Sequence, residues 1–108
     1  MKKYLQLMPR NSLNINKKLL SILSQLGENI KLARLRRNIS MEEISIKTNI
    51  SLPTIRKIEQ GNPNVSIGLY SKILQVMELE TDIAKVGYAD TNGRKLQDKN
   101  LGERVNKK

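Results

Sequence analysis

The sequence predicts an all-α protein, a compact domain of five short helices. Apolar residues recur at helical spacing from Leu26 onward, the pattern of helices that bury one face. Serines stand directly before three of the expected helices, where their hydroxyls can accept hydrogen bonds from first-turn amides. The chain of 108 residues can bury one small core, which must be aliphatic because Phe and Trp are absent.

The first two helices are expected over residues 26–37 and 41–48. The inward face of the first carries apolar residues beside two arginines: Leu26, Ile30, Ala33, Arg34 and Arg37. The second opens with SMEE at residues 40–43, a capping box in which serine and glutamate each accept from the other's backbone amide. Ile44 then faces the core.

The stretch NISLPTIRKIEQG, which begins at Asn49, predicts a tight turn and a third helix over residues 52–60. Asn49 tolerates the positive φ of a tight turn, and Ser51 can cap the helix. Pro53 fits the first turn, where amides have no intrahelical partner, and Gly61 can end the helix in the left-handed conformation. So short a helix is unstable alone and must be held by packing.

A fourth and a fifth helix complete the domain. Ser66 caps the fourth, whose core stripe is Tyr70, Ile73, Leu74 and Met77. The fifth is short, begins at Thr81 or Asp82 and ends near Val86. The polar, basic tail over residues 91–108 has few apolar anchors, so we expect it to be mobile until a partner orders it.

Composition excludes most catalytic chemistry. The chain has no Cys and no His, which removes disulfides, thiol nucleophiles, imidazole bases and nearly all zinc sites. We therefore expect no enzyme, no catalytic residue, no metal and no cofactor. No apolar run reaches the length of a membrane span, and the one near the N-terminus is too short for a signal peptide, so we expect a cytoplasmic protein.

The net charge of +10 favours a polyanionic partner. This charge is concentrated at the ends of the chain. Residues 1–37 carry nine basic and one acidic side chain, whereas residues 62–90 carry two basic and four acidic ones.

The helices at 41–48 and 52–60, with the tight turn between them, have the form of a helix-turn-helix. Ile55 and Ile58 are spaced to anchor the second helix to the core. The opposite face carries Leu52, Pro53, Arg56, Lys57 and Gln60. In a DNA major groove, Arg or Lys can bind guanine and Leu can contact a thymine methyl group. A merely solvated basic face is the alternative, but the turn, the caps and the charge together favour DNA contact.

Residues 26–79 resemble the Cro/C1-type (XRE, lambda repressor-like) helix-turn-helix family of repressors. They resemble HipB-type antitoxins more closely, through the stretches LARLRRNIS and GNPNVSIG and, further on, GRKLQD in the tail. The resemblance implies a DNA-binding domain, here residues 23–88. A partly ordered N-terminal extension over residues 1–22 and the basic tail over residues 89–108 would flank it as flexible basic extensions.

The resemblance also implies function. Such proteins form homodimers, bind an inverted-repeat operator in double-stranded DNA, repress their own operon and bind a HipA-like serine/threonine kinase toxin. The positions that would face the operator are Ser51, Leu52, Pro53, Thr54, Arg56 and Lys57. The family further implies a structural ion pair between Arg34 and Glu59. From the fourth helix onward, Leu79 and Ile83 are candidates for the dimer interface.

Leu52 and Pro53 depart from the family pattern, in which polar residues are frequent, and Met41 stands where glutamine is frequent. Because Leu and Pro cannot hydrogen-bond bases, specificity must depend on Arg56, Lys57, methyl contacts or DNA shape.

Three exposed apolar residues are also expected, at Leu32, Leu35 and Ile46; the leucine pair can pack against the N-terminal segment or a second subunit. Two other functions stay open. One is a phage-type or housekeeping regulator with no toxin partner. The other, an RNA-binding or protein-interaction module, is disfavoured because three Tyr and no other aromatic residue leave little for base stacking.

Overall fold

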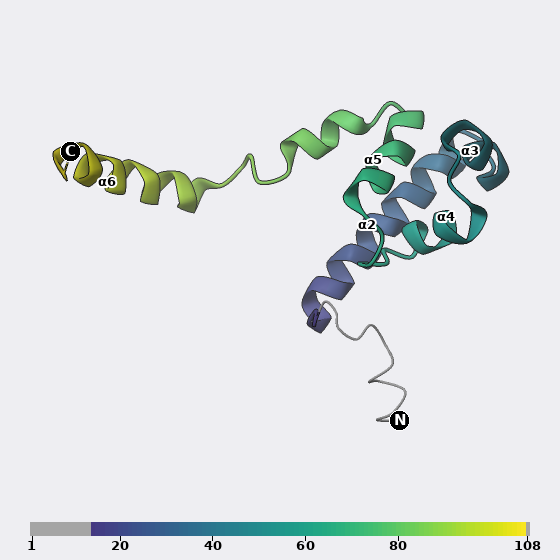
Figure 1. The fold of residues 1–108 in the computed structure, drawn as a ribbon, viewed down its shortest axis with the longest axis horizontal. Helices are drawn as coiled ribbons and strands as arrows, with labels where there is room; N and C mark the ends of the chain where they lie inside the picture. Colours follow the sequence, from purple (N-terminus) through teal and green to yellow (C-terminus); the bar gives the residue numbers. More distant parts are fainter. Residues whose placement is uncertain (1–13, 108) are drawn as a thin grey trace, which may run out of the picture.

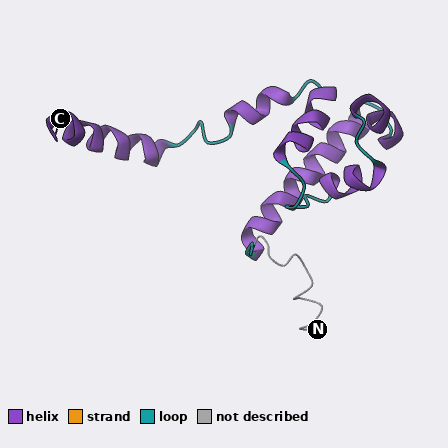
Figure 2. Ribbon diagram, in the orientation of Figure 1, coloured by secondary structure: helices purple, strands orange, loops and turns teal. Residues whose placement is uncertain are grey.

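A computed structural model describes residues 14–107, and every regular element in this range is helical (Figures 1 and 2). The prediction of an all-α fold is confirmed. In chain order the elements are α2 (Lys17–Arg36), α3 (Met41–Thr48), α4 (Leu52–Glu59), α5 (Ile67–Val76), the 3₁₀ helix η2 (Glu80–Lys85) and α6 (Thr91–Lys107). Within this range, no helix is long and apolar enough to cross a membrane.

Helix α2 begins well before the predicted start at Leu26. Asn16 caps it, and the Asn16 side chain accepts a hydrogen bond from the amide of Leu19 at 2.9 Å. The helix therefore adds more than two turns on its N-terminal side. The predicted boundary between residues 22 and 23 falls inside α2, because a local cap and a continuing apolar stripe extend the helix past the core.

The predicted caps of the short helices are present. In the capping box of α3, Ser40 accepts from the amide of Glu43 at 3.0 Å, and Glu43 accepts from the amide of Ser40 at 2.9 Å. The Ser51 hydroxyl caps α4 by accepting from the amide of Thr54, and the Ser66 hydroxyl caps α5 by accepting from the amide of Leu69. These caps fix where each helix starts, because they satisfy first-turn amides that have no intrahelical acceptor.

The core is aliphatic, as predicted. Five isoleucines are almost fully buried: Ile30, Ile44, Ile55, Ile58 and Ile73. The predicted stripe of the fourth helix is also buried, at Tyr70, Ile73, Leu74 and Met77. Helix α2 packs against α4, while α3 packs against both α4 and α5.

The C-terminal part differs from the sequence prediction. The fifth helix is a 3₁₀ helix, η2, and starts at Glu80. The tail forms α6, a helix that was not predicted, and it extends away from the other helices (Figure 1). Asp90 starts it by accepting from the amide of Gly93 at 3.0 Å, a capping interaction that the polar composition of the tail obscured.

Three apolar side chains point outward, as expected. Leu32 is 39%, Leu35 50% and Ile46 82% exposed. All three remain exposed to solvent within residues 14–107. A contact between the leucine pair and the first thirteen residues would lie outside the described part of the chain.

Candidate nucleic-acid interface

The turn between α3 and α4 is fixed by a set of short hydrogen bonds. Asn49 adopts the left-handed conformation, with φ of 63°, as its side chain predicted. The Ser45 hydroxyl donates to the carbonyl of Ile50 at 2.6 Å, and the Thr48 hydroxyl accepts from the Ile50 amide at 3.2 Å. Lys72 of α5 donates to the carbonyl of Thr48 at 2.8 Å, so a cation lies at the C-terminus of α3. These three hydrogen bonds stabilise the turn and so the angle between α3 and α4.

Helix α4 has one fully buried and one exposed face. Ile55 and Ile58 are 0% exposed and anchor the helix to the core. Arg56 and Lys57 are exposed on the other side, and Gln60, which ends the helix, is exposed as well. The structure therefore separates anchor and outward residues as the sequence predicted.

The first turn of α4 is less open than the sequence suggested. Ser51 and Pro53 are exposed, whereas Leu52 and Thr54 are half-buried. Leu52 packs against the core, and the Thr54 hydroxyl accepts a hydrogen bond from the Ser51 hydroxyl at 3.0 Å. Of the six positions that the family resemblance places on DNA, four are thus exposed: Ser51, Pro53, Arg56 and Lys57.

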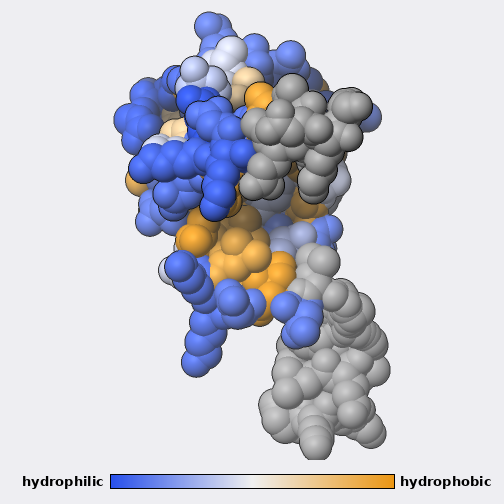
Figure 3. Space-filling model, turned by 90° about the vertical axis from the view of Figure 1, so that its left-hand side faces the viewer, coloured by the Kyte–Doolittle hydropathy of each residue, from blue (hydrophilic) through white to orange (hydrophobic). Residues whose placement is uncertain are grey.

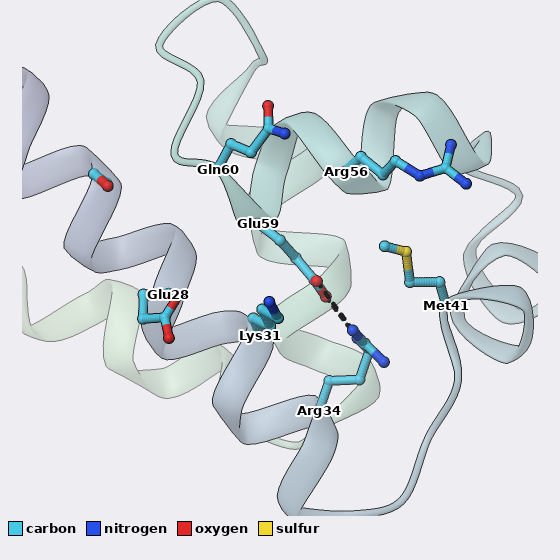
Figure 4. Close-up of a pocket in the computed structure, with 8 residues that line it drawn as sticks. Glu28, Lys31, Arg34, Met41, Arg56, Glu59 and Gln60 are labelled. Carbon is cyan, nitrogen blue, oxygen red and sulfur yellow. Dashed lines mark hydrogen bonds and ion pairs between the residues drawn. The ribbon is translucent and has the colours of Figure 1, made fainter.

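Arg34 and Glu59 form a two-pronged ion pair between α2 and the end of α4 (Figure 4). Arg34 Nε donates to Glu59 Oε2 at 2.6 Å, and Nη2 donates to Oε1 at 3.1 Å. Nη1 donates to the carbonyl of Ile39 at 3.0 Å. The hydrogen bond to Glu59 raises the pKa of Arg34 above its ordinary value, against the opposing effect of burial. The pair ties the end of α4 to α2, as the family resemblance implied.

Two glycines bring α2 and the end of α4 into backbone contact. A Cβ at Gly27 would lie 2.6 Å from the carbonyl oxygen of Glu59, and a Cβ at Gly61 would meet the backbone of Leu23 and Ser24. Gly61 also has φ of 74°, as predicted for the residue that ends the helix. The importance of Gly27 was not predicted. A glycine inside a helical pattern hints at close packing, but its neighbour comes from a distant part of the chain.

A polar hollow of about 400 Å³ lies between α2, the start of α3 and α4 (Figure 4). Its lining residues are Ser24, Glu28, Lys31, Arg34, Met41, Arg56, Glu59 and Gln60. Lys31 therefore lies on the same hollow as Arg56, and this position was not predicted from the sequence. Its position, one turn before Arg34 on α2, is the feature that could have identified it.

The exposed cations of this surface are free to bind anions. Over the described part of the chain, the ion pairs are those of Arg34 with Glu59 and of Lys85 with Asp82. Lys31, Arg56 and Lys57 take part in neither. Unpaired cations on an exposed helix are suited to contact phosphates, and an arginine can in addition bind the edge of a guanine.

Comparison with known proteins agrees with this geometry. Searches against curated proteins and solved structures gave no significant match. Residues 30–83, half of the chain, match the helix-turn-helix family model, and this segment contains α3, the turn and α4. The chain therefore belongs to the Cro/C1-type helix-turn-helix family and is a DNA-binding transcription regulator.

Proposed function

We propose that this regulator is a cytoplasmic homodimeric repressor that binds an inverted-repeat operator and acts as a HipB-like antitoxin for a HipA-like serine/threonine kinase. The observation that supports DNA binding is that α4 has one buried face and one exposed, basic face. Its isoleucines are fully buried, while Arg56 and Lys57 are exposed and outside any ion pair in the described residues. The cations are therefore presented on a helix that the core holds in place.

Specific binding depends mainly on Arg56 in this proposal. Arginine can donate two hydrogen bonds to guanine in the major groove, which discriminates against other bases. Lys57 is the second candidate for base contact, and Pro53 and the exposed part of Leu52 supply apolar contacts. Lys31, on α2, contacts the phosphate backbone, which positions the protein but carries no sequence information.

A homodimer presents two copies of the α4 surface related by a two-fold axis. An operator that is an inverted repeat has the same symmetry. The two recognition helices would lie about 34 Å apart, one turn of B-DNA, so that both enter successive major grooves on one face. Leu79, directly before η2, and Ile83, within η2, are half-buried against the core, and they remain our interface candidates.

The antitoxin role is supported by the resemblance of three short stretches to HipB-type proteins. The first, LARLRRNIS, contains Arg34 of the ion pair. The second is a loop after α4, which is held by a hydrogen bond from the Tyr70 hydroxyl to the carbonyl of Asn62 at 2.7 Å. The third, GRKLQD, lies on α6, where Leu96 is 60% exposed. The ordered loop after α4 and the exposed Leu96 of α6 are both suited to contact a protein partner.

Two experiments test these roles separately. Selection from a pool of random duplexes, followed by footprinting, should return a two-fold symmetric site protected on one face of the DNA. Recovery of only random sequences would contradict sequence-specific binding. For the antitoxin role, this protein should be co-expressed with the kinase-like product of a neighbouring reading frame. Co-purification and relief of growth arrest are expected.

The alternative is a phage-type or housekeeping regulator with no toxin partner. It predicts the same symmetric operator and the same dimer. The absence of a kinase-like neighbouring frame, together with a symmetric operator, would favour this alternative.

A further inference from the structure

An apolar groove of about 360 Å³ lies between the N-terminal half of α2 and the part of the chain that follows α4. Leu23 and Leu26 line it from α2, and Ile67, Ile83 and Val86 line it from the opposite side. Ile67 is 69% and Val86 79% exposed, so the groove is open over the described residues. Figure 3 shows a hydrophobic area on this side of the molecule. Concave apolar surface of this kind is typical of binding sites.

The chain enters the described structure at the rim of this groove. Ile15, the residue before the cap of α2, lines the groove and is half-buried. Residues 1–13 are joined to the chain next to this point. An occupant that belongs to the same chain therefore has the shortest distance to cover if it comes from the N-terminus.

The N-terminal sequence has the composition of such an occupant. Its apolar cluster is YLQLM, residues 4–8. In an extended chain alternate residues share a side, which groups Leu5 with Leu7. In a helix the i, i+3, i+4 spacing groups Tyr4, Leu7 and Met8. Leu7 belongs to the apolar side in both cases and Gln6 to neither, so the cluster can present at least two apolar side chains to one surface.

The length of the connection also fits. From Met8 to Ile15 the chain can span at most about 25 Å, whereas Leu26, at the far end of the α2 side of the groove, lies about 14 Å from the start of α2. Residues 4–8 can therefore reach the whole groove. A short covalent link gives such a segment an effective concentration on the order of 1 mM, with which any free partner must compete.

We propose that residues 4–8 of the same chain occupy this groove and pack against Leu23, Ile67 and Val86. The segment covers apolar side chains that the described residues leave open, and its own apolar side chains leave water at the same time. The inference is independent of the operator, the dimer and the kinase of the proposed function, because it concerns one chain alone.

The leucine pair on α2 is the competing site for this segment. Leu32 and Leu35 are exposed, but helical spacing places them on the opposite side of α2 from Leu23 and Leu26. They also lie more than about 20 Å from the start of α2, near the limit of the connection, whereas the groove begins at Ile15 itself. The groove is therefore the nearer surface. Helix α6, at the other end of the chain, extends away from the domain (Figure 1).

A segment in this groove would support the recognition helix. Asn62 and Pro63, in the loop that follows α4, also line the groove. Tyr70 lines it from α5, and its hydroxyl donates to the carbonyl of Asn62 at 2.7 Å. On the α2 side, the carbonyl of Leu23 lies against Gly61, which ends α4. An occupied groove thus contacts the residues that hold the end of α4 on both sides, and so stabilises the orientation of this helix.

A nitroxide label locates the segment directly. The chain has no cysteine, so Gln6→Cys gives one attachment site, on the side of the cluster that faces away from the groove. In the full chain without DNA, the label should broaden the amide NMR signals of Ile67 and Val86 strongly. The signals of Leu35 and of Ile46, in α3, should change little, because α3 contributes no residue to the groove. Isotope-enriched chains without the label, mixed with labelled chains, should show no broadening, since the contact is within one chain.

Leu7→Asp and Gln6→Asp form a matched pair, because they introduce the same charge at neighbouring positions. Deletion of residues 1–13 should shift the amide signals of Ile67 and Val86, and those of Gly61 and Asn62 with them. Leu7→Asp should reproduce these shifts, because an unpaired carboxylate is costly to bury in an apolar groove. Gln6→Asp should keep the spectrum of the wild type. Circular dichroism establishes that each variant keeps the helices of the domain.

Three results would overturn the inference. Broadening of Leu35 in place of Ile67 and Val86 would place the segment on the leucine pair. Broadening in the mixed sample would show that the segment contacts a second copy. Equal spectra for Leu7→Asp and Gln6→Asp at Ile67 and Val86 would show that the groove does not hold the cluster. None of these results bears on operator or kinase binding, which are tested separately.

Discussion

Gly27 in α2 and Gly61 after α4 lie in backbone contact, with no space for a side chain on either residue. Intrinsic helix propensity alone would predict that Gly27→Ala stabilises the protein by about 1 kcal/mol. The added methyl group would, however, lie 2.6 Å from the carbonyl oxygen of Glu59, an atom that cannot rotate away. We therefore expect a net destabilisation of about 1–3 kcal/mol, since overpacking against backbone exceeds the gain in propensity.

Gly68→Ala is the control for this substitution. Gly68 lies in α5, and a Cβ there would be 3.7 Å from its nearest neighbour, the Ser66 hydroxyl. This variant should be neutral or slightly stabilising in urea denaturation. If both alanine variants raise stability, the contact between the glycines is looser than described.

The ion pair between Arg34 and Glu59 gives the second prediction. The two side chains are 9% and 5% exposed, so removal of one partner leaves a charge in a nearly dry environment. Glu59→Gln should lower the free energy of unfolding by about 3–5 kcal/mol. The double variant Arg34→Met with Glu59→Leu should cost less than the sum of the single changes, because no charge is left buried. Additive effects in denaturant titrations would show that the pair is not coupled.

Local features of the fold could be predicted from the sequence, and features that depend on distant contacts could not. Ser40, Asn49 and Gly61 each act on neighbouring backbone, so residue type and spacing were sufficient to predict the capping box, the tight turn and the helix end. The hydrogen bond from Lys72 to Thr48 joins residues 24 apart, and no local pattern indicates it. The role of Gly27 was missed for the same reason.

The predicted site shows the same limit. Helical spacing separated Ile55 and Ile58 from Arg56 and Lys57 correctly, because this division depends only on the period of one helix. It could not show that Leu52 is partly covered by the core, nor that Lys31 lies on the same hollow as Arg56. Both facts depend on how α4 packs against the rest of the domain.

Substitutions at Arg56 and Lys31 should separate base contact from phosphate contact. Arg56→Ala should cost about 1–3 kcal/mol on the selected operator and relax the preference for one base pair. Lys31→Ala should weaken binding to all duplexes alike and reduce the slope of log affinity against log salt by about one. Titrations on operator and random DNA at several salt concentrations measure both. Equal losses on both duplexes for Arg56→Ala would contradict its role in base contact.

The capping box of α3 should make stability depend on pH. The hydrogen bond from the Ser40 amide lowers the pKa of Glu43 below its ordinary value, so its carboxylate is favoured in the folded state. A group with a lowered pKa contributes stability above its unfolded pKa and loses it as the pH falls through the folded value. Glu43→Gln keeps an acceptor but removes the charge. Its stability should therefore fall below that of the wild type at pH 7, and the difference should vanish in acid.

Ser40→Ala provides the comparison for the capping box. It removes the acceptor for the Glu43 amide and should cost about 0.5–2 kcal/mol at neutral pH. If the difference in stability between the wild type and Glu43→Gln is the same at pH 7 and at pH 3, the charge of Glu43 has no part in the cap.

The last prediction concerns α6. This helix extends from the domain and leaves Leu96 60% and Leu101 50% exposed, which suits a helix that binds a partner (Figure 1). If that partner is the kinase, deletion of residues 91–108 should weaken kinase binding sharply and operator binding only slightly at physiological salt. Leu96→Asp in the full chain should reproduce the loss, because it removes an apolar anchor while it lowers the positive charge by only one.

The competing role for α6 is a basic arm that adds non-specific affinity for DNA. It predicts the opposite pattern, in which truncation reduces DNA binding strongly and leaves the kinase complex intact. Reversal of Lys95 and Lys99 to Glu separates the two roles, because an arm that binds phosphates depends on charge and salt concentration, whereas an anchor at Leu96 depends on apolar contact. A kinase complex that survives both the truncation and Leu96→Asp would exclude α6 as its binding site.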